Sequence, residues 1–154
     1  MGALLLTLLA CNPYEGTWVL YAEVSKSPSD SEIGRDYSTS LELFALSDGS
    51  YAATLGSSPL VGTIENNELS LEDTSGYTYS APNCDENTST STTSLEGEFD
   101  GQGGFSGKLK QVSTQETKGC GGDDSDSTTY EYTLTGVKLS ANDPAHAGDL
   151  SFGY

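Results

Sequence analysis

The residues that could carry out chemistry are few and far apart in this chain. There is one histidine, His146, and there is no Gly-x-Ser-x-Gly elbow that would expose a serine nucleophile. His146 lies in residues 140–154, which follow the last segment with strand periodicity and are interpreted as a C-terminal tail. Nucleophilic catalysis needs a base beside the nucleophile. We therefore predict a protein that is not an enzyme, with no catalytic residues and no cofactor.

Carboxylates are abundant, but their spacing matches no defined type of site. With 23 Asp and Glu residues, a pair at the separation needed for glycoside hydrolysis cannot be recognised in the sequence, so a hydrolase stays a less favoured alternative. The densest run, Asp123, Asp124 and Asp126, lacks the spacing of an EF-hand loop. Such a run is more often a solvated loop. We predict no metal site, with these three residues as weak candidates only.

Composition and charge exclude several classes of function. A chain of 154 residues fits one domain, and 22 serines and 17 threonines with few helix-forming runs favour β-structure. Only 6 Lys and Arg residues give a formal charge of -17, so nucleic acid is excluded as a partner. The acidity is typical of life in high salt or of a cationic partner. Acids spread along the whole chain favour the first interpretation.

The first eleven residues indicate export. Residues 1–10 form an apolar segment too short to span a bilayer, and the segment ends at a cysteine. Leu8-Leu9-Ala10-Cys11 resembles the lipobox of bacterial lipoproteins. The resemblance implies cleavage before Cys11, a lipid on Cys11 and attachment to a membrane of the cell envelope, with the outer membrane or cell surface favoured over the inner membrane. Ordinary secretion with a chance cysteine is the alternative, and the absence of Lys and Arg from residues 1–10 leaves the true start open.

Cysteine usage agrees with export. With Cys11 assigned to lipid by that resemblance, Cys84 and Cys120 form the remaining pair. Because secreted proteins seldom leave two thiols free, we predict a disulfide between them. Its loop of about 37 residues would contribute on the order of 4 kcal/mol in the chain-entropy model. Zinc held by these cysteines and His146 is the weaker alternative.

Alternating hydrophobicity predicts an all-β fold of eight strands. The predicted strands are residues 16–24, 38–47, 50–56, 60–65, 68–73 (continuing perhaps to 80), 93–99, 104–113 and 128–139. Asp48-Gly49, Asn66-Asn67 and residues 100–104 have the composition of tight hairpins. Residues 25–37, 74–92 and 114–127 are expected to be long polar loops.

These connections predict an antiparallel up-and-down meander that closes into a roughly eight-stranded barrel. Alternate connections of a meander lie at the same end, so the tight hairpins share one end and the long loops share the other. Cys84 and Cys120 both fall on the long-loop end. The expected organisation is a signal peptide (1–10), a lipidated N-terminus and short tether (11–15), the barrel (16–139) and the tail (140–154).

The barrel resembles the small bacterial lipocalin-like lipoproteins and, more distantly, the lipocalin and avidin group. The resemblance rests on Gly16-Thr17-Trp18 at the start of the first strand, on strands with inward glycines and on the tight hairpins. It implies a barrel interior that could hold a ligand. The candidate lining residues are Trp18, Leu43, Phe99, Phe105, Tyr130 and Tyr132. Alternatively, aromatic side chains could fill the space above the glycines. This filled-barrel alternative is slightly favoured.

The sequence therefore predicts a lipid-anchored lipoprotein of the bacterial cell envelope with a binding role. The expected ligand is a small neutral or apolar molecule, or an envelope partner protein, bound at the long-loop end. The alternative is a structural or protein-interaction lipoprotein with a filled barrel and no ligand.

Overall fold

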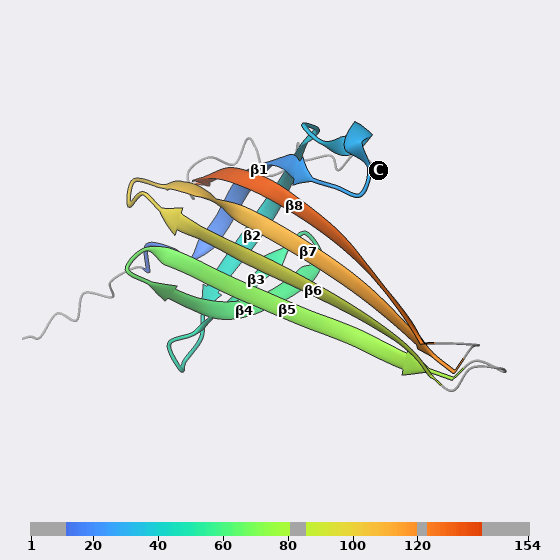
Figure 1. The fold of residues 1–154 in the computed structure, drawn as a ribbon. Helices are drawn as coiled ribbons and strands as arrows, with labels where there is room; N and C mark the ends of the chain where they lie inside the picture. Colours follow the sequence, from blue (N-terminus) through green and yellow to red (C-terminus); the bar gives the residue numbers. More distant parts are fainter. Residues whose placement is uncertain (1–11, 81–85, 120–122, 140–154) are drawn as a thin grey trace, which may run out of the picture.

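The structure is a computed structural model that describes residues 12–80, 86–119 and 123–139. Eight antiparallel strands form one closed barrel in chain order, with β8 pairing back onto β1 (Figure 1). The strands are β1 (Gly16–Lys26), β2 (Asp36–Ala45), β3 (Tyr51–Leu55), β4 (Ser58–Glu65), β5 (Glu68–Tyr79), β6 (Glu86–Phe99), β7 (Gly104–Lys118) and β8 (Asp124–Lys138). A short 3-10 helix, η1 (Asp30–Glu32), lies in the β1–β2 connection.

This architecture confirms the predicted all-β, up-and-down barrel and is consistent with the lipocalin-like resemblance. Each strand pairs with its neighbour in the chain, and the β1–β8 seam closes the sheet from Trp18 opposite Lys138 to Lys26 opposite Glu131. A register shift interrupts the seam between Val24 and Lys26. Within the barrel, closure removes the exposed edges that an open sheet would present.

The tight turns form where the sequence supplies residues that accept a left-handed backbone. Asn66 and Asn67 have φ of 54° and 71° and connect β4 to β5 in two residues. Asparagine tolerates this conformation better than most residues, and two such residues in succession are typical of the hairpin turn that matches the twist of a sheet. This turn fixes Glu65 opposite Glu68 and so sets the register of both strands.

The barrel interior is a packed hydrophobic core. Inward positions alternate with solvent-facing ones along each strand, as the period of two predicts. The core consists mainly of leucines, with aromatic rings at one end: Trp18, Leu20, Ala22, Leu41, Leu43, Ala53, Leu55, Leu60, Leu69, Leu71, Leu95, Phe99, Phe105, Leu109 and Leu134.

Inward glycines make room for large neighbours rather than for a ligand. A Cβ built on Gly97 or Gly107 would collide with the ring of Phe105, which therefore lies across both glycines. A Cβ on Gly136 would collide with the side chain of Leu20. The space above these glycines is filled, which agrees with the filled-barrel alternative.

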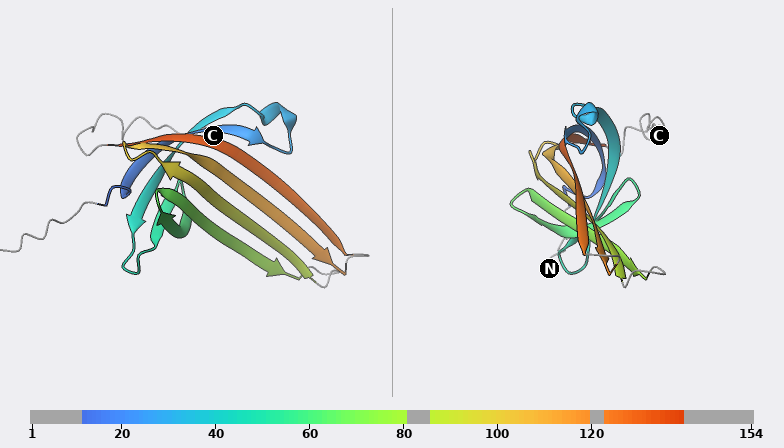
Figure 2. Two further views of the ribbon diagram at one scale, coloured as in Figure 1. Left: turned by 60° about the vertical axis from the view of Figure 1, so that its left-hand side comes forward. Right: turned by 45° about the vertical axis from the view of Figure 1, so that its right-hand side comes forward.

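Two of the three predicted long loops, residues 74–92 and 114–127, are wrong because most of their residues are strand. Residues 74–79, 86–92, 112–118 and 124–130 continue β5 to β8 beyond the barrel, in register from Thr74 opposite Thr92 to Thr117 opposite Asp124. We call these four segments the extension; it projects from one end of the barrel as a four-stranded sheet (Figure 2). The connections themselves are residues 80–85 and 119–123. The sequence predicted only part of the extension, namely strand at residues 112–113 and 128–130 and the optional continuation of the fifth strand to residue 80. The segments look like loops because they lack hydrophobic alternation, but threonine favours strands and neighbouring strands satisfy their backbone groups.

The extension shares the end of the barrel at which the β1–β2 connection lies, so the predicted division into two unlike ends holds. No helix in the described ranges is long and apolar enough to cross a membrane.

Candidate functional site at the barrel mouth

The tight-hairpin end of the barrel is sealed by aromatic side chains. The rings of Trp18 and Phe99 lie 4.8 Å apart between centroids, and the ring of Tyr14 covers Phe99 at 5.0 Å. The indole Nε1 of Trp18 donates to the carbonyl of Tyr14 at 2.9 Å, so the buried polar atom of the ring is satisfied. No ligand can enter the barrel past this plug without displacing Tyr14.

The predicted tether is bound to the same end. Asn12 Nδ2 donates to the hydroxyl of Tyr51 at 2.9 Å, and Lys138 Nζ donates to the carbonyl of Pro13 at 2.6 Å. Glu15 Oε1 accepts the backbone N–H of Ala45 at 2.8 Å. Residues 12–15 are therefore held against the β2–β3 and β8 ends of the strands instead of extending freely.

The residues predicted to line a ligand cavity divide into two groups. Trp18, Leu43, Phe99 and Phe105 are each at most 5% exposed and belong to the packed core. Tyr132 is partly buried and contacts the core from the opposite end, and Tyr130 is the next residue on the same face of β8. The structure does not bring all six together around one space.

At the end opposite the plug, the core opens into a hollow of about 250 Å³. We call it the mouth; its lining residues are Ala22, Tyr37, Thr39, Leu55, Ser58, Leu109, Gln111 and Tyr132. They come from β1, β2, β3, β4, β7 and β8, so the whole rim of the barrel contributes except β5 and β6. A mostly apolar floor with a few hydroxyl and amide groups is the usual composition of a small-molecule site.

Among the residues that line the mouth, Tyr132 has a shifted pKa. Burial raises the pKa of its hydroxyl, and the carboxylate of Glu32, together with the phenolates that Tyr37 and Tyr130 would become in the same alkaline range, raises the pKa further. Glu32 belongs to η1, so the β1–β2 connection lies near the mouth. Tyr132 therefore presents a neutral hydroxyl to the mouth at neutral pH.

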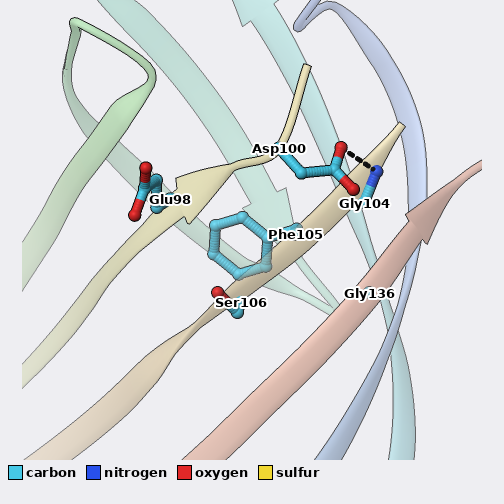
Figure 3. Close-up of a pocket in the computed structure, with 6 residues that line it drawn as sticks. All are labelled: Glu98, Asp100, Gly104, Phe105, Ser106 and Gly136. Carbon is cyan, nitrogen blue, oxygen red and sulfur yellow. Dashed lines mark hydrogen bonds between the residues drawn. The ribbon is translucent and has the colours of Figure 1, made fainter. Parts of the chain in front are cut away.

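A second hollow, of about 320 Å³, lies on the outer surface beside the β6–β7 turn (Figure 3). Two carboxylates, Glu98 and Asp100, line it. Oδ1 of Asp100 accepts the backbone N–H of Gln102 at 2.7 Å and of Gly104 at 2.8 Å, and these two hydrogen bonds lower the pKa of Asp100. Asp100 therefore holds the turn in shape, and a hollow with two carboxylates is less suited to a neutral or apolar ligand than the mouth.

The acidic run Asp123, Asp124 and Asp126 does not form a cation site in the structure. Oδ1 of Asp124 and Oδ1 of Asp126 each accept the backbone N–H of the next residue, at 2.9 Å and 2.8 Å. No group of three or more metal-ligating side chains occurs among the described residues. Cys11, Cys84, Cys120 and His146 lie outside the described residues, as does the predicted tail.

Sequence reasoning missed most of the mouth. Tyr37 and Thr39 were assigned to a loop or to the edge of a strand, and Gln111 is a polar residue at an inward position of β7. The available signal was their position in the strand. Tyr37 and Thr39 precede Leu41, the first inward leucine of β2, and Gln111 follows Leu109, the last inward leucine of β7, so each lies on the inward face where its strand reaches the rim.

Comparisons with protein families, with curated proteins and with solved structures find no match for this chain. The function must therefore be argued from the barrel and its two ends.

Proposed function

We propose that the protein is a non-catalytic, lipid-anchored lipoprotein of the bacterial cell envelope that binds a small neutral or apolar molecule at the mouth. The observation that carries the proposal is the position of the mouth. It is the open end of an otherwise filled barrel, and it lies opposite the end to which residues 12–15 are bound.

The anchor is supported by the lipobox and by the path of the tether. Asn12, next to Cys11 in the chain, is hydrogen bonded to Tyr51 at the plugged end. A lipid on Cys11 would thus hold the plugged end toward the membrane and turn the mouth away from it. The mouth would then face solvent, where a ligand or a partner can reach it.

The chemical class of the ligand follows from the lining. Leu55, Leu109 and the ring of Tyr132 offer apolar contact, and Thr39, Ser58 and Gln111 offer hydrogen bonds without charge. The surrounding protein has a formal charge of -17, which repels anions. A neutral molecule with an apolar body and one or two hydrogen-bonding groups fits this lining best.

A non-catalytic role is supported by the distribution of acids. The buried polar residues of the described chain are Asn87 and Thr93, so none of the described carboxylates is buried as a hydrolase with a raised-pKa acid would need.

Binding of the neutral dye Nile red, followed by fluorescence, tests the proposal. Ser58→Trp should fill the mouth and abolish binding, whereas Ser70→Trp places the same ring on the outer face of β5 and should leave binding unchanged. Equal loss in both variants, or no binding to the unaltered protein, would contradict a site at the mouth.

A second candidate function is favoured by the packed core. With Trp18, Phe99 and Phe105 filling the interior, the barrel could act as a rigid support for a protein interaction and bind no small molecule. Native mass spectrometry of protein purified from its host distinguishes the two candidates. A co-purifying small molecule supports the first, and a bound protein with an empty mouth supports the second.

A further inference from the structure

The extension has two free edges with different chemistry. Beyond Glu72, which is opposite Val61 of β4, residues 74–79 of β5 pair only with β6. Before Glu131, which is opposite Lys26 of β1, residues 124–130 of β8 pair only with β7. Within the described part of the chain, nothing pairs with the outer side of either segment.

The register identifies which backbone groups face the free edge of β5. Phe99 N donates to the carbonyl of Asn67 at 3.0 Å, and the β5–β6 register continues without a shift to Tyr79 opposite Asn87. Hydrogen-bonded pairs recur at every second residue in an antiparallel pair. Odd-numbered residues of β5 therefore bond to β6, and the N–H and C=O of Thr74, Gly76 and Thr78 point to the free edge.

The β5 edge lacks every usual protection against pairing. Natural edge strands carry charged side chains, prolines or bulges that block association. The edge of β8 carries Asp124 and Asp126, but the β5 segment reads Thr-Ser-Gly-Tyr-Thr-Tyr and has no charge, no proline and no register shift. In a chain with 23 acidic residues, an uncharged edge lets two copies approach without placing like charges directly opposite each other.

We propose that two copies of the chain pair through this edge, antiparallel and centred on Gly76, into one sheet that runs across both extensions. In this register Gly76 lies opposite Gly76 of the second copy, and Thr74 lies opposite Thr78. The outward N–H and C=O groups of Thr74, Gly76 and Thr78 are then satisfied in both copies. The pairing is isologous, so it closes at a dimer.

Two exposed aromatic rings support a second copy of the chain as the partner of this edge. Tyr77 and Tyr79 lie on the same face of β5, 65% and 47% exposed, with ring centroids 6.0 Å apart. In the proposed pairing the two Tyr77 residues become diagonal neighbours at roughly 7–8 Å, within reach of aromatic side chains. The exposed stack of one copy then contacts that of the other.

The antiparallel arrangement of the two β5 strands also limits which membrane-anchored copies can form the dimer. Because the paired strands are antiparallel, the two barrels lie at opposite ends of the joined sheet. If the plugged end faces the membrane as proposed above, copies anchored in two facing membranes can pair, whereas neighbours in one membrane cannot. The dimer itself does not depend on the anchor.

Sedimentation velocity tests the dimer. The measurement uses the full chain carrying Cys11→Ser, over a wide range of protein concentration and with a reductant present. Thr78→Pro removes an N–H that faces the free edge and leaves the backbone hydrogen bonds between β5 and β6 intact, although it loses the exposed side-chain contact between Thr78 Oγ1 and Thr88 Oγ1 at 3.3 Å. The control on the other edge is Ser127→Pro, because Lys138 N donates to the carbonyl of Gly103 and the same parity argument turns Ser127 toward the free edge of β8. This variant also loses the local hydrogen bond from Ser127 N to Oδ1 of Asp126, so it perturbs its own edge at least as much as Thr78→Pro does. We expect loss of the dimer in Thr78→Pro and an unchanged dimer in Ser127→Pro.

A charge exchange tests the register without proline. Thr74→Asp with Thr78→Asp sets carboxylates opposite each other and should abolish the dimer, whereas Thr74→Lys with Thr78→Asp sets opposite charges together and should restore it. The proposal is overturned by a monomer at all concentrations, by polymers larger than a dimer, by a dimer that needs a disulfide, or by equal effects of the two proline variants.

Discussion

The hydroxyl of Tyr14 donates to Oδ1 of Asn67 at 2.6 Å and ties the N-terminal tether to the β4–β5 turn. The two residues are 53 positions apart in the chain. The ring of Tyr14 also covers the ring of Phe99. One side chain thus seals the barrel and fixes the direction in which the chain leaves it.

Removing Tyr14 should open the plug. Tyr14→Phe loses one exposed hydrogen bond and should lower the free energy of unfolding by about 0.5–1 kcal/mol. Tyr14→Ala also loses the ring contacts with Phe99 and Tyr51 and should cost about 2–3 kcal/mol, less than a fully buried ring because Tyr14 is only partly buried. Urea unfolding followed by the fluorescence of the single tryptophan measures both. Equal effects would show that the ring contributes nothing to the seal.

The fit of Leu20 over Gly136 should appear as non-additive stability. Gly136→Ala drives a methyl group against Leu20 and should cost about 1–3 kcal/mol, and Leu20→Val should cost about 1 kcal/mol alone. In the double variant the shorter side chain relieves the clash, so the total should fall below the sum by about 0.5–2 kcal/mol. Gly107→Ala is the control, because its methyl group would meet Phe105 and Glu96, not Leu20. Rescue of Gly107→Ala by Leu20→Val would refute this account.

The disulfide between Cys84 and Cys120 stays a prediction from the sequence, because both cysteines lie outside the described residues. Its reason is that a secreted protein seldom leaves two thiols free. Non-reducing peptide mapping should find a Cys84–Cys120 peptide, and Cys84→Ser should lower the thermal midpoint. An unchanged midpoint, or a bridge to Cys11, would contradict the pairing.

Acid should weaken the β6–β7 turn through Asp100. Two backbone N–H donors hold the pKa of its carboxyl below the usual 3.8, so the folded state binds this proton less readily than the unfolded chain. The stabilisation is present above the unfolded pKa and is lost as the pH falls through the lowered folded pKa. Asp100→Ala should therefore lower the thermal midpoint at neutral pH, and its effect should shrink as the pH falls below 3.8 and through the lowered pKa of the folded state, where the wild-type carboxyl is also protonated. A constant difference across this range would assign the effect to something other than the ionised carboxylate.

The sequence predicted those parts of the fold in which a local residue pattern is compatible with only one structure. Leu69 and Leu71 on one face of β5 mark a barrel wall, and Asn66-Asn67 marks a hairpin. The extension was missed because its pairing depends on neighbouring strands and not on burial. Thr88 and Thr90 could belong to a loop or to a strand, and only the register with β5 and β7 decides.

The candidate site was harder to predict than the fold. Phe99 and Phe105 look like ligand contacts in a hollow barrel and like core residues in a filled one, and the difference depends on how Phe105 lies over Gly97. Side-chain direction above a glycine is not encoded in a local pattern. The mouth likewise depends on where six strands reach the rim together.

If a lipid on Cys11 anchors the protein as proposed, the tether sets the orientation of the barrel at the membrane. Residues 12–15 are bound to the plugged end, and a lipid on Cys11 would keep that end against the bilayer, because even a fully extended chain of this length reaches only roughly 15 Å. In intact cells, single cysteines introduced at Ser29 and Ser125, which lie beyond the mouth, should react readily with a membrane-impermeant maleimide. A cysteine at Gln102, in the β6–β7 turn at the plugged end, should react slowly. The same three variants should react equally when the full chain carries Cys11→Ser and is free in solution, since all three positions are exposed. Faster reaction at Gln102 than at Ser125 on cells would reverse the orientation and place the mouth toward the membrane.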